Sequence, residues 1–234
     1  MITIAVINES PISDAEIQKM LPAFETQWNR DLRPAWALEE SKFTLVSKAD
    51  LVPPGAWWLV WLNDSDQADA LAYHDVTDEG LPLSKVFVKT IQGDNASLSV
   101  AATHEICEMA VDPTLNLAAQ DQAGTFWAYE IADPVESDQY GYEIDGILVT
   151  DFVLPSWFGF KSSQAPFDFK HHCTDAFQVL AGGYAQKFTQ DGWMQVTKRA
   201  NSHRANHPSE GSRRERRSRG HARWNRSRQR SAHR

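Results

Sequence analysis

Three ionisable side chains lie within five residues of one another in an apolar stretch of the chain. His104, Glu105 and Glu108 fall inside residues 95–113, a segment that otherwise consists mostly of alanine, valine, leucine, isoleucine, methionine and cysteine. Ionised carboxylates in an apolar interior are costly unless they are paired, hydrogen-bonded or bound to a metal. Histidine nitrogen and carboxylate oxygen are both metal ligands, so one interpretation of the group is a site for a divalent cation. The alternative is an ordinary buried segment whose carboxylates meet arginines or backbone donors elsewhere in the fold.

A helix must position these groups. Asn95 or Ser97 can cap its start, and the step 112–113, Asp-Pro, should stop it because proline disfavours helical geometry in the residue before it. Apolar residues fall on nearly every side of this helix, which predicts that it is buried. Residues four apart lie on the same helix face, so the histidine and the second glutamate can face one ion with the first glutamate beside them.

The motif His104-Glu105-Ile106-Cys107-Glu108 resembles the metal-binding helix of the zincin metallopeptidases, whose pattern is His-Glu-x-x-His. In that family the two histidines bind zinc, and the glutamate is the general base that takes a proton from the metal-bound water. The resemblance implies that His104 binds the metal, that Glu105 is the base and that Glu108 replaces the second histidine. A histidine with carboxylates also suits manganese, iron or calcium, so zinc is expected while these alternatives remain open.

The resemblance also implies a third ligand further along the chain. In one branch of the family this ligand is a glutamate from a second helix, and Glu130, 22 positions after Glu108, is the candidate. Asp133 would then hydrogen-bond to one of the ligands. Asp112 lies about 12 Å along the helix from His104, so we expect it to make the turn that follows the helix.

Four further side chains could donate a hydrogen bond to a developing oxyanion, a role that some zincins give to a downstream histidine or tyrosine. They are Tyr140, Tyr142, His171 and His172. Each of them has a structural role as its alternative. The two adjacent histidines could also replace Glu130 as metal ligands.

The chain divides into an acidic body and a basic tail. Residues 1–197 contain 10 Lys or Arg and 29 Asp or Glu, a net charge of −19, whereas residues 198–234 contain 13 against 2, a net charge of +11. The body has enough apolar residues for one domain, but the tail has almost no large apolar residue and is predicted to be disordered. We expect the tail to bind polyanions weakly through counterion release, with a solvated arginine-rich segment as the alternative.

Targeting signals are not evident in the sequence. Residues 1–7 are apolar but short and have no basic residue before them, so they predict a buried strand and not a signal peptide. No apolar run approaches the length of a membrane span. Cys107 and Cys173 do not suggest a disulfide framework. We therefore expect a soluble protein, either cytoplasmic or associated with a particle.

The order of the expected elements is that of an α+β fold. A first helix follows the capping box at residues 13–16, and hairpins are predicted to turn at residues 145–146 and 191–192. The predicted strands cover residues 1–7, 43–46, 57–62 and 85–91. The acidic residues 63–80, which include His74, are predicted to form a solvated loop. By the resemblance, residues 85–91 would be the sheet edge that holds a peptide substrate through backbone pairing.

Together these patterns predict a zincin-like α+β domain over residues 1–197, in which a mixed β-sheet packs on the metal-site helix and hairpins follow. Two functions fit this prediction. One is a metal-dependent peptidase or other hydrolase in which Glu105 activates a metal-bound water. The other is a catalytically inactive zincin-like protein with a binding or structural role, for example in a phage particle. The absent second histidine favours the inactive protein, whereas Glu105 favours the enzyme.

Overall fold

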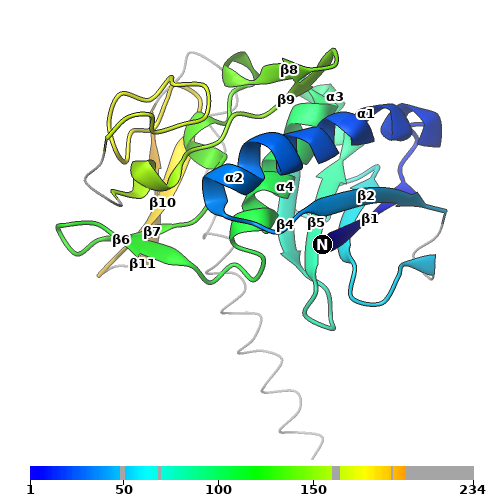
Figure 1. Cartoon of the computed structure of the whole chain (residues 1–234), viewed down its shortest axis with the longest axis horizontal. Helices are drawn as coiled ribbons and strands as arrows, with labels where there is room; N and C mark the ends of the chain where they lie inside the picture. Colours follow the sequence, from blue (N-terminus) through cyan, green and yellow to red (C-terminus); the bar gives the residue numbers. More distant parts are fainter. Residues whose placement is uncertain (48–50, 68–69, 160–163, 191, 199–234) are drawn as a thin grey trace, which may run out of the picture.

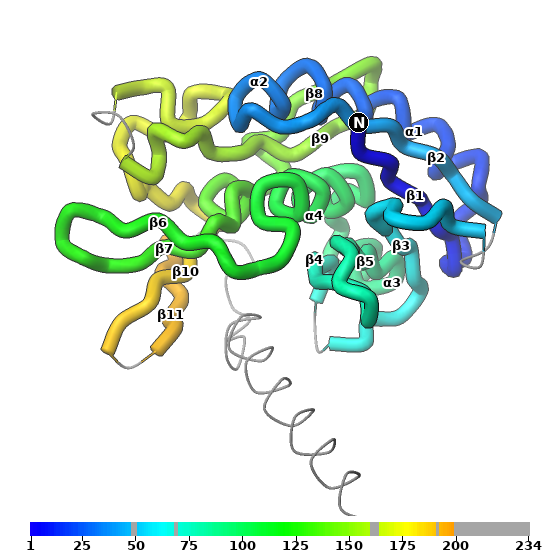
Figure 2. Tube along the Cα trace, turned by 60° about the horizontal axis from the view of Figure 1, so that its bottom comes forward, coloured from blue at the N-terminus to red at the C-terminus, as the bar shows by residue number. Residues whose placement is uncertain are grey.

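A computed structural model of the protein describes residues 1–47, 51–67, 70–159, 164–190 and 192–198. The predicted disordered tail therefore lies outside the described residues, apart from Lys198. Figure 1 shows a larger sheet on the right and a smaller one on the left, with helix α4 (Leu98–Val111) between them. The same arrangement is visible in the rotated view of Figure 2.

The larger sheet is built from the N-terminal half of the chain. Its strands are β1 (Ile2–Glu9), β2 (Ser41–Val46), β3 (Trp57–Leu62), β4 (Ala72–Val76) and β5 (Pro82–Phe87), in the order β2-β1-β3-β5-β4. The first three and β5 are parallel, and β4 is the outer strand, antiparallel to β5. Strand β3 is apolar along its whole length and lies at the centre of the sheet, as a strand covered on both faces should.

The first helical segment follows β1. Helix α1 (Asp14–Thr26) begins at Ser13, whose hydroxyl accepts a hydrogen bond from the Glu16 N–H, which confirms the predicted cap. The chain continues through a π-helical segment η1 (Gln27–Leu32) and a short helix α2 (Arg33–Trp36). Helix α1 lies across the sheet in Figure 1 and buries an apolar stripe against it.

Helix α4 is the predicted buried helix. It begins at Ser97, whose hydroxyl accepts a hydrogen bond from the Val100 N–H, and all of its residues except Leu98 are buried. The helix packs against β4, β5 and the later strand β9 (Ile147–Val149). After the helix, Asp112 accepts hydrogen bonds from the N–H groups of Asn116 and Leu117, so it makes the turn as expected.

The C-terminal part forms the smaller sheet and a separate hairpin. Strands β6 (Ala118–Gln120), β7 (Phe126–Ala128), β10 (Tyr184–Thr189) and β11 (Gly192–Thr197) pair in the antiparallel order β11-β10-β7-β6. Strands β8 (Tyr142–Ile144) and β9 form the hairpin predicted at residues 145–146, both of which have positive φ. Short 3-10 helices η3 (Asp133–Val135), η4 (Asp138–Tyr140) and η5 (Pro155–Phe158) lie in the connections. A short helix α3 (Val88–Gly93) follows β5.

Two local predictions are wrong. Residues 63–80 contain strand β4, and His74 on that strand is 1% exposed instead of solvated. The strand predicted over 85–91 ends at Phe87, and the chain then enters helix α3. Strand β5 pairs with β3 on one side and β4 on the other, so the sheet edge is β4. The predicted sheet edge is wrong because the unrecognised β4 pairs in a hairpin with β5 and covers the edge that β5 would have offered.

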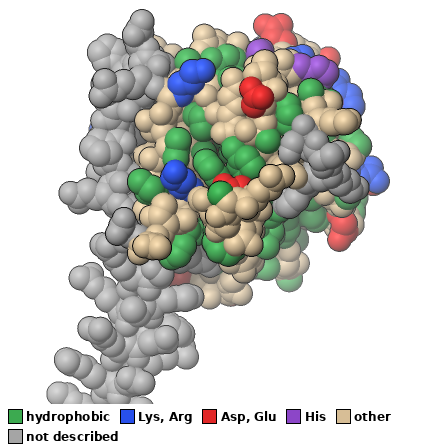
Figure 3. All heavy atoms as spheres, turned by 90° about the vertical axis from the view of Figure 1, so that its left-hand side faces the viewer, with side chains coloured by type: hydrophobic (Ala, Val, Ile, Leu, Met, Phe, Trp, Pro, Cys, Tyr) green, Lys and Arg blue, Asp and Glu red, His purple; other side chains and the backbone are tan. Residues whose placement is uncertain are grey.

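The predicted α+β class with a mixed sheet is confirmed. Within the described residues, no helix combines the length and apolar character needed to cross a membrane. Apolar side chains gather on the face shown in Figure 3, which looks at the molecule from the side of the smaller sheet. Phe126, Phe188 and Met194 on its strands are each more than two-fifths exposed.

Candidate metal centre

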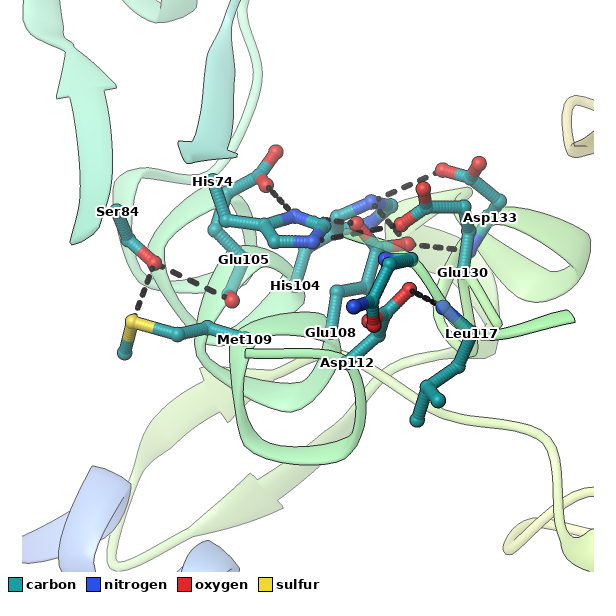
Figure 4. A network of polar contacts seen from close by, with 11 residues as sticks. His74, Ser84, His104, Glu105, Glu108, Met109, Asp112, Leu117, Glu130 and Asp133 are labelled. Carbon is teal, nitrogen blue, oxygen red and sulfur yellow. Dashed lines mark hydrogen bonds and ion pairs between the residues drawn. The ribbon is translucent and has the colours of Figure 1, made fainter. Parts of the chain in front are cut away.

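Six ionisable side chains from three parts of the fold meet in one buried cluster (Figure 4). Helix α4 supplies three of them, strand β4 supplies one, and the segment that runs from the end of β7 into η3 supplies two. In chain order the members are His74, His104, Glu105, Glu108, Glu130 and Asp133, each no more than 6% exposed. We call these six residues the His–carboxylate cluster.

Glu108 lies between the two histidines. Its Oε1 is 3.2 Å from His104 Nε2, and its Oε2 is 3.4 Å from His74 Nδ1. The N–H of Asp133 also donates a hydrogen bond to Oε1, at 3.3 Å. Because Glu108 is one helical turn beyond His104, the helix itself brings these two side chains together, as the sequence predicted.

Each histidine meets further carboxylates. His104 Nε2 lies 3.2 Å from Asp133 Oδ1, and His104, Glu108 and Asp133 can offer ligand atoms that all lie within 4.8 Å of one another. His74 Nδ1 lies 3.3 Å from Glu105 Oε2. His74, Glu105 and Glu108 form a second such group, so Glu108 belongs to both.

These separations differ from those of the ordinary ion pairs of this chain. Lys85 Nζ lies 2.6 Å from Asp66, and Lys89 Nζ lies 2.7 Å from Asp64, as expected for charge-assisted hydrogen bonds. The nitrogen–oxygen separations in the cluster run from 3.2 to 3.6 Å. Ligands placed tetrahedrally about 2.0–2.1 Å from zinc are about 3.3–3.4 Å apart. The separations in the cluster are therefore compatible with a bound metal ion, as are those between His172 and its two carboxylates, 3.2 and 3.4 Å.

Several buried atoms in the cluster are left unsatisfied. Within the described part of the chain, His74 Nε2, Glu108 Oε2 and Asp133 Oδ2 are buried and have no hydrogen-bond partner. A buried polar atom without a partner costs about 1–3 kcal/mol, and more if it is charged. A bound cation would satisfy the carboxylate oxygens and remove this cost.

The histidines respond strongly to the surrounding carboxylates. Burial is the largest influence on His74 and by itself would lower its pKa. The attraction of Glu130, the hydrogen bond with Glu105 and the proximity of Glu108 instead raise that pKa to about 10. Burial would likewise lower the pKa of His104, but Glu108 and other carboxylates raise it well above its ordinary value.

The carboxylates respond in opposite directions. Burial would raise the pKa of Glu108, but the attraction of His104 and His74 holds it well below its ordinary value. Burial and repulsion by Glu108 raise the pKa of Asp133 well above its ordinary value, against the hydrogen bond with His104. The opposite shifts of Glu108 and Asp133 show that the two carboxylates differ in how strongly they favour the ionised form.

Of the two downstream carboxylates, Asp133 makes the contact predicted for it, because its Oδ1 lies at hydrogen-bond distance from His104 Nε2, 3.2 Å. Glu130 is placed differently from the prediction, in the connection between β7 and η3 and not on a second helix. Its Oε2 is 3.6 Å from His74 Nε2. Asp133, predicted to support a ligand, directly faces His104 beside Glu108. The structure thus brings both residues into the cluster, and Asp133 takes the place beside His104 that the sequence assigned to Glu130.

The four candidate oxyanion donors make contacts elsewhere. The Tyr142 hydroxyl donates to Asp31 Oδ2 at 2.8 Å, on the side of η1. The rings of Tyr140 and His172 lie together, with centroids 5.1 Å apart. His171 is exposed and has a positive φ. Tyr140, Tyr142 and His172 therefore make structural contacts, and the role of all four residues as donors stays a prediction.

His172 belongs to a smaller group with Asp151 and Asp168. His172 Nδ1 lies 3.2 Å from Asp151 Oδ2 and 3.4 Å from Asp168 Oδ2. Burial and the proximity of Asp168 raise the pKa of Asp151 to about 9. Both carboxylates also accept backbone hydrogen bonds, Asp151 from Phe152 and Asp168 from the 172–173 backbone. This group is thus satisfied internally, unlike the His–carboxylate cluster.

His74 is the member that the sequence analysis missed. Its neighbours in Ala72–Val76 include tyrosine and valine, and residues 77–80 end in a glycine with positive φ that turns the chain into β5. A short strand followed by such a turn is a hairpin signal. The acidic composition of the surrounding segment concealed it.

Comparisons with known proteins add no assignment to this geometry. No protein-family model, no curated protein and no solved structure matches the chain.

Proposed function

We propose that this protein is a divalent-metal-dependent hydrolase of the zincin type that acts on peptide bonds. The observation that carries the proposal is the convergence on Glu108 of histidines and carboxylates that are buried, spaced like ligands and incompletely hydrogen-bonded. Such an arrangement is costly without a cation and favourable with one.

The residues fit a metal. His104, Glu108 and Asp133 would hold it, with one imidazole nitrogen and two carboxylate oxygens that already face one another. Zinc accepts this donor set, and manganese, iron and calcium remain alternatives because oxygen predominates. A metal held in this way supplies a Lewis acid that lowers the pKa of a water bound at an open position.

Glu105 is the proposed general base. It lies next to His104 on α4, in the position that the zincin motif gives to the base, and it is 2% exposed. Its contact with His74 at 3.3 Å holds one carboxylate oxygen in a fixed direction. Glu105 would accept a proton from water and later donate it to the leaving amine.

Strand β4 is the proposed position of the substrate. It is the outer strand of the larger sheet, and its His74 belongs to the cluster. A peptide that pairs with the backbone of β4 would pass alongside the cluster, by the β-augmentation mode that the sequence analysis assigned to residues 85–91. The proposed substrate strand is thus moved from β5 to β4.

The test is cleavage of a peptide library by the full-length protein, with and without a chelator. We expect chelator-sensitive cleavage that Glu105→Gln abolishes while metal remains bound at His104, Glu108 and Asp133. The matched control is Glu143→Gln, at an exposed position of the β8–β9 hairpin, which should keep full activity. Absence of bound metal in the wild type would reject the proposal.

A second function retains support from one feature, the glutamate in place of the second zincin histidine. Under this alternative the domain binds metal but serves as a binding or structural module. Its distinguishing result is stoichiometric metal without cleavage of any peptide, in a protein that unfolds at lower temperature once the metal is removed. In that outcome the metal site stands and the enzyme does not.

A further inference from the structure

We propose that the His–carboxylate cluster holds two divalent cations bridged by Glu108. The inference rests on the proposed function, because it extends the same site. One cation would be bound by His104, Glu108 Oε1 and Asp133. The other would be bound by His74 Nδ1, Glu105 Oε2 and Glu108 Oε2.

The two carboxylate oxygens of Glu108 face different histidines, Oε1 toward His104 and Oε2 toward His74. The two ligand groups share this residue, and each adds one carboxylate of its own. A carboxylate whose two oxygens serve separate ligand groups has the arrangement of a bridge between metals.

Both ligand groups are rich in carboxylates. Each places two carboxylates beside one imidazole: Glu108 and Asp133 beside His104, and Glu105 and Glu108 beside His74. A cation in either group would therefore be paired with buried carboxylate oxygens, and pairing is what makes buried charge tolerable.

The ring of His74 has carboxylates on both sides. Its Nδ1 faces Glu105 and Glu108, while Nε2 is buried, lacks a hydrogen-bond partner among the described residues and lies 3.6 Å from Glu130 Oε2. Histidines that bind metals commonly direct their other ring N–H to a carboxylate, which fixes the tautomer. Glu130 Oε2 lies on this side of the ring, at a separation longer than a hydrogen bond, so a small movement would let it accept the Nε2–H once Nδ1 binds a metal.

The inference is compatible with the role proposed for Glu105. Only Oε2 of its carboxylate is assigned to the second cation. The other oxygen of a carboxylate bound in this way can still exchange a proton. The second cation would therefore position the base and would not replace it.

The test is metal stoichiometry of the full-length protein. Metal-free protein is saturated with zinc, passed over a desalting column and analysed for zinc per chain by mass spectrometry. We expect two equivalents in the wild type, one in His74→Ala, one in His104→Ala and fewer than one in Glu108→Ala. His172→Ala is the control and should retain two, since it belongs to the separate group with Asp151 and Asp168.

The outcomes separate this inference from the proposed function. One equivalent in the wild type that is lost in His104→Ala overturns the second cation and leaves the proposed function intact. No equivalent overturns both. Two equivalents that persist in His74→Ala overturn the inference, because the second cation then lies elsewhere.

A measurement on the wild type guards against variants that fail to fold. Two manganese ions joined by a carboxylate interact magnetically, so the electron paramagnetic resonance spectrum at two equivalents should differ from twice the spectrum at one. A spectrum that merely doubles in intensity would overturn the bridge.

Discussion

Replacing His74 by alanine in the metal-free protein should cause a large loss of stability that diminishes as the pH rises. The imidazole is the buried cation facing Glu105, Glu108 and Glu130, and removing one partner of a buried ion pair costs about 3–5 kcal/mol. Raising the pKa of His74 from 6.5 to about 10 corresponds to about 5 kcal/mol, which agrees with that range.

The sign of the pH dependence follows from the direction of this shift. A group whose pKa is higher in the folded state stabilises the fold fully below its unfolded pKa and loses this effect as the pH rises through the folded value. The contribution of His74 is therefore complete below about pH 6.5 and absent above about pH 10. The difference between wild type and His74→Ala should shrink across this window to the cost of the cavity alone.

The assay is urea unfolding in the presence of a chelator at pH 6, 8 and 10. The control is His172→Ala. The His172 side chain is 36% exposed, and interactions at such a position are weakened by solvent, so this substitution should cost about 1 kcal/mol or less. A loss for His74→Ala that is the same at pH 6 and pH 10 would refute the reasoning. So would a loss no larger than that of the control.

Three further predictions concern the pair Asp151 and Asp168 and the binding of zinc. Asp151→Asn should leave the free energy of unfolding at pH 7 unchanged or higher, because the high pKa of Asp151 means that a neutral side chain already occupies this position. Asp168→Asn should lower the free energy of unfolding by about 1–3 kcal/mol, because the asparagine NH₂ group would face a backbone N–H donor. Equal losses in urea titrations of the two variants would contradict this. Zinc at about one hundred times its dissociation constant should stabilise the fold by about 2.7 kcal/mol and raise the melting temperature by about 5–10 °C. Calorimetry would measure this rise relative to the metal-free protein in chelator. An unchanged melting temperature would count against a zinc site in the folded protein. Zinc binding should release protons, and the affinity for zinc should increase between pH 6 and pH 9, because His74 and His104 must lose the protons that the nearby carboxylates favour. Heats of binding that are identical in buffers of different ionisation enthalpy would exclude this proton release.

Helix α4 was predictable because its signals are local. The capping residue Ser97, the apolar run and the stop before Pro113 all lie within one short segment, and the i, i+4 spacing places His104 beside Glu108 on any helix. The β8–β9 hairpin was predictable for the same reason, since residues 145–146 favour positive φ.

The remaining parts of the cluster depend on long-range pairing. Strand β4 has only five residues, and His74 reaches the cluster because that strand pairs with β5 in a register that places it opposite Ser84. Asp133 lies beside His104, and Glu130 lies beside His74, because of the path that the chain takes from β7 into η3, which no local spacing rule fixes. Sequence spacing identified these two carboxylates as candidates, but only the tertiary fold distinguishes which one faces His104.

The central claim is that a divalent cation binds at Glu108, and anomalous diffraction tests it most directly. Crystals of the full-length protein would be soaked in zinc and measured on both sides of the zinc absorption edge. The account predicts an anomalous peak about 2.0–2.2 Å from His104 Nε2, Glu108 Oε1 and Asp133 Oδ1. A map with no peak beside Glu108, and with the histidines still facing the carboxylates, would contradict it.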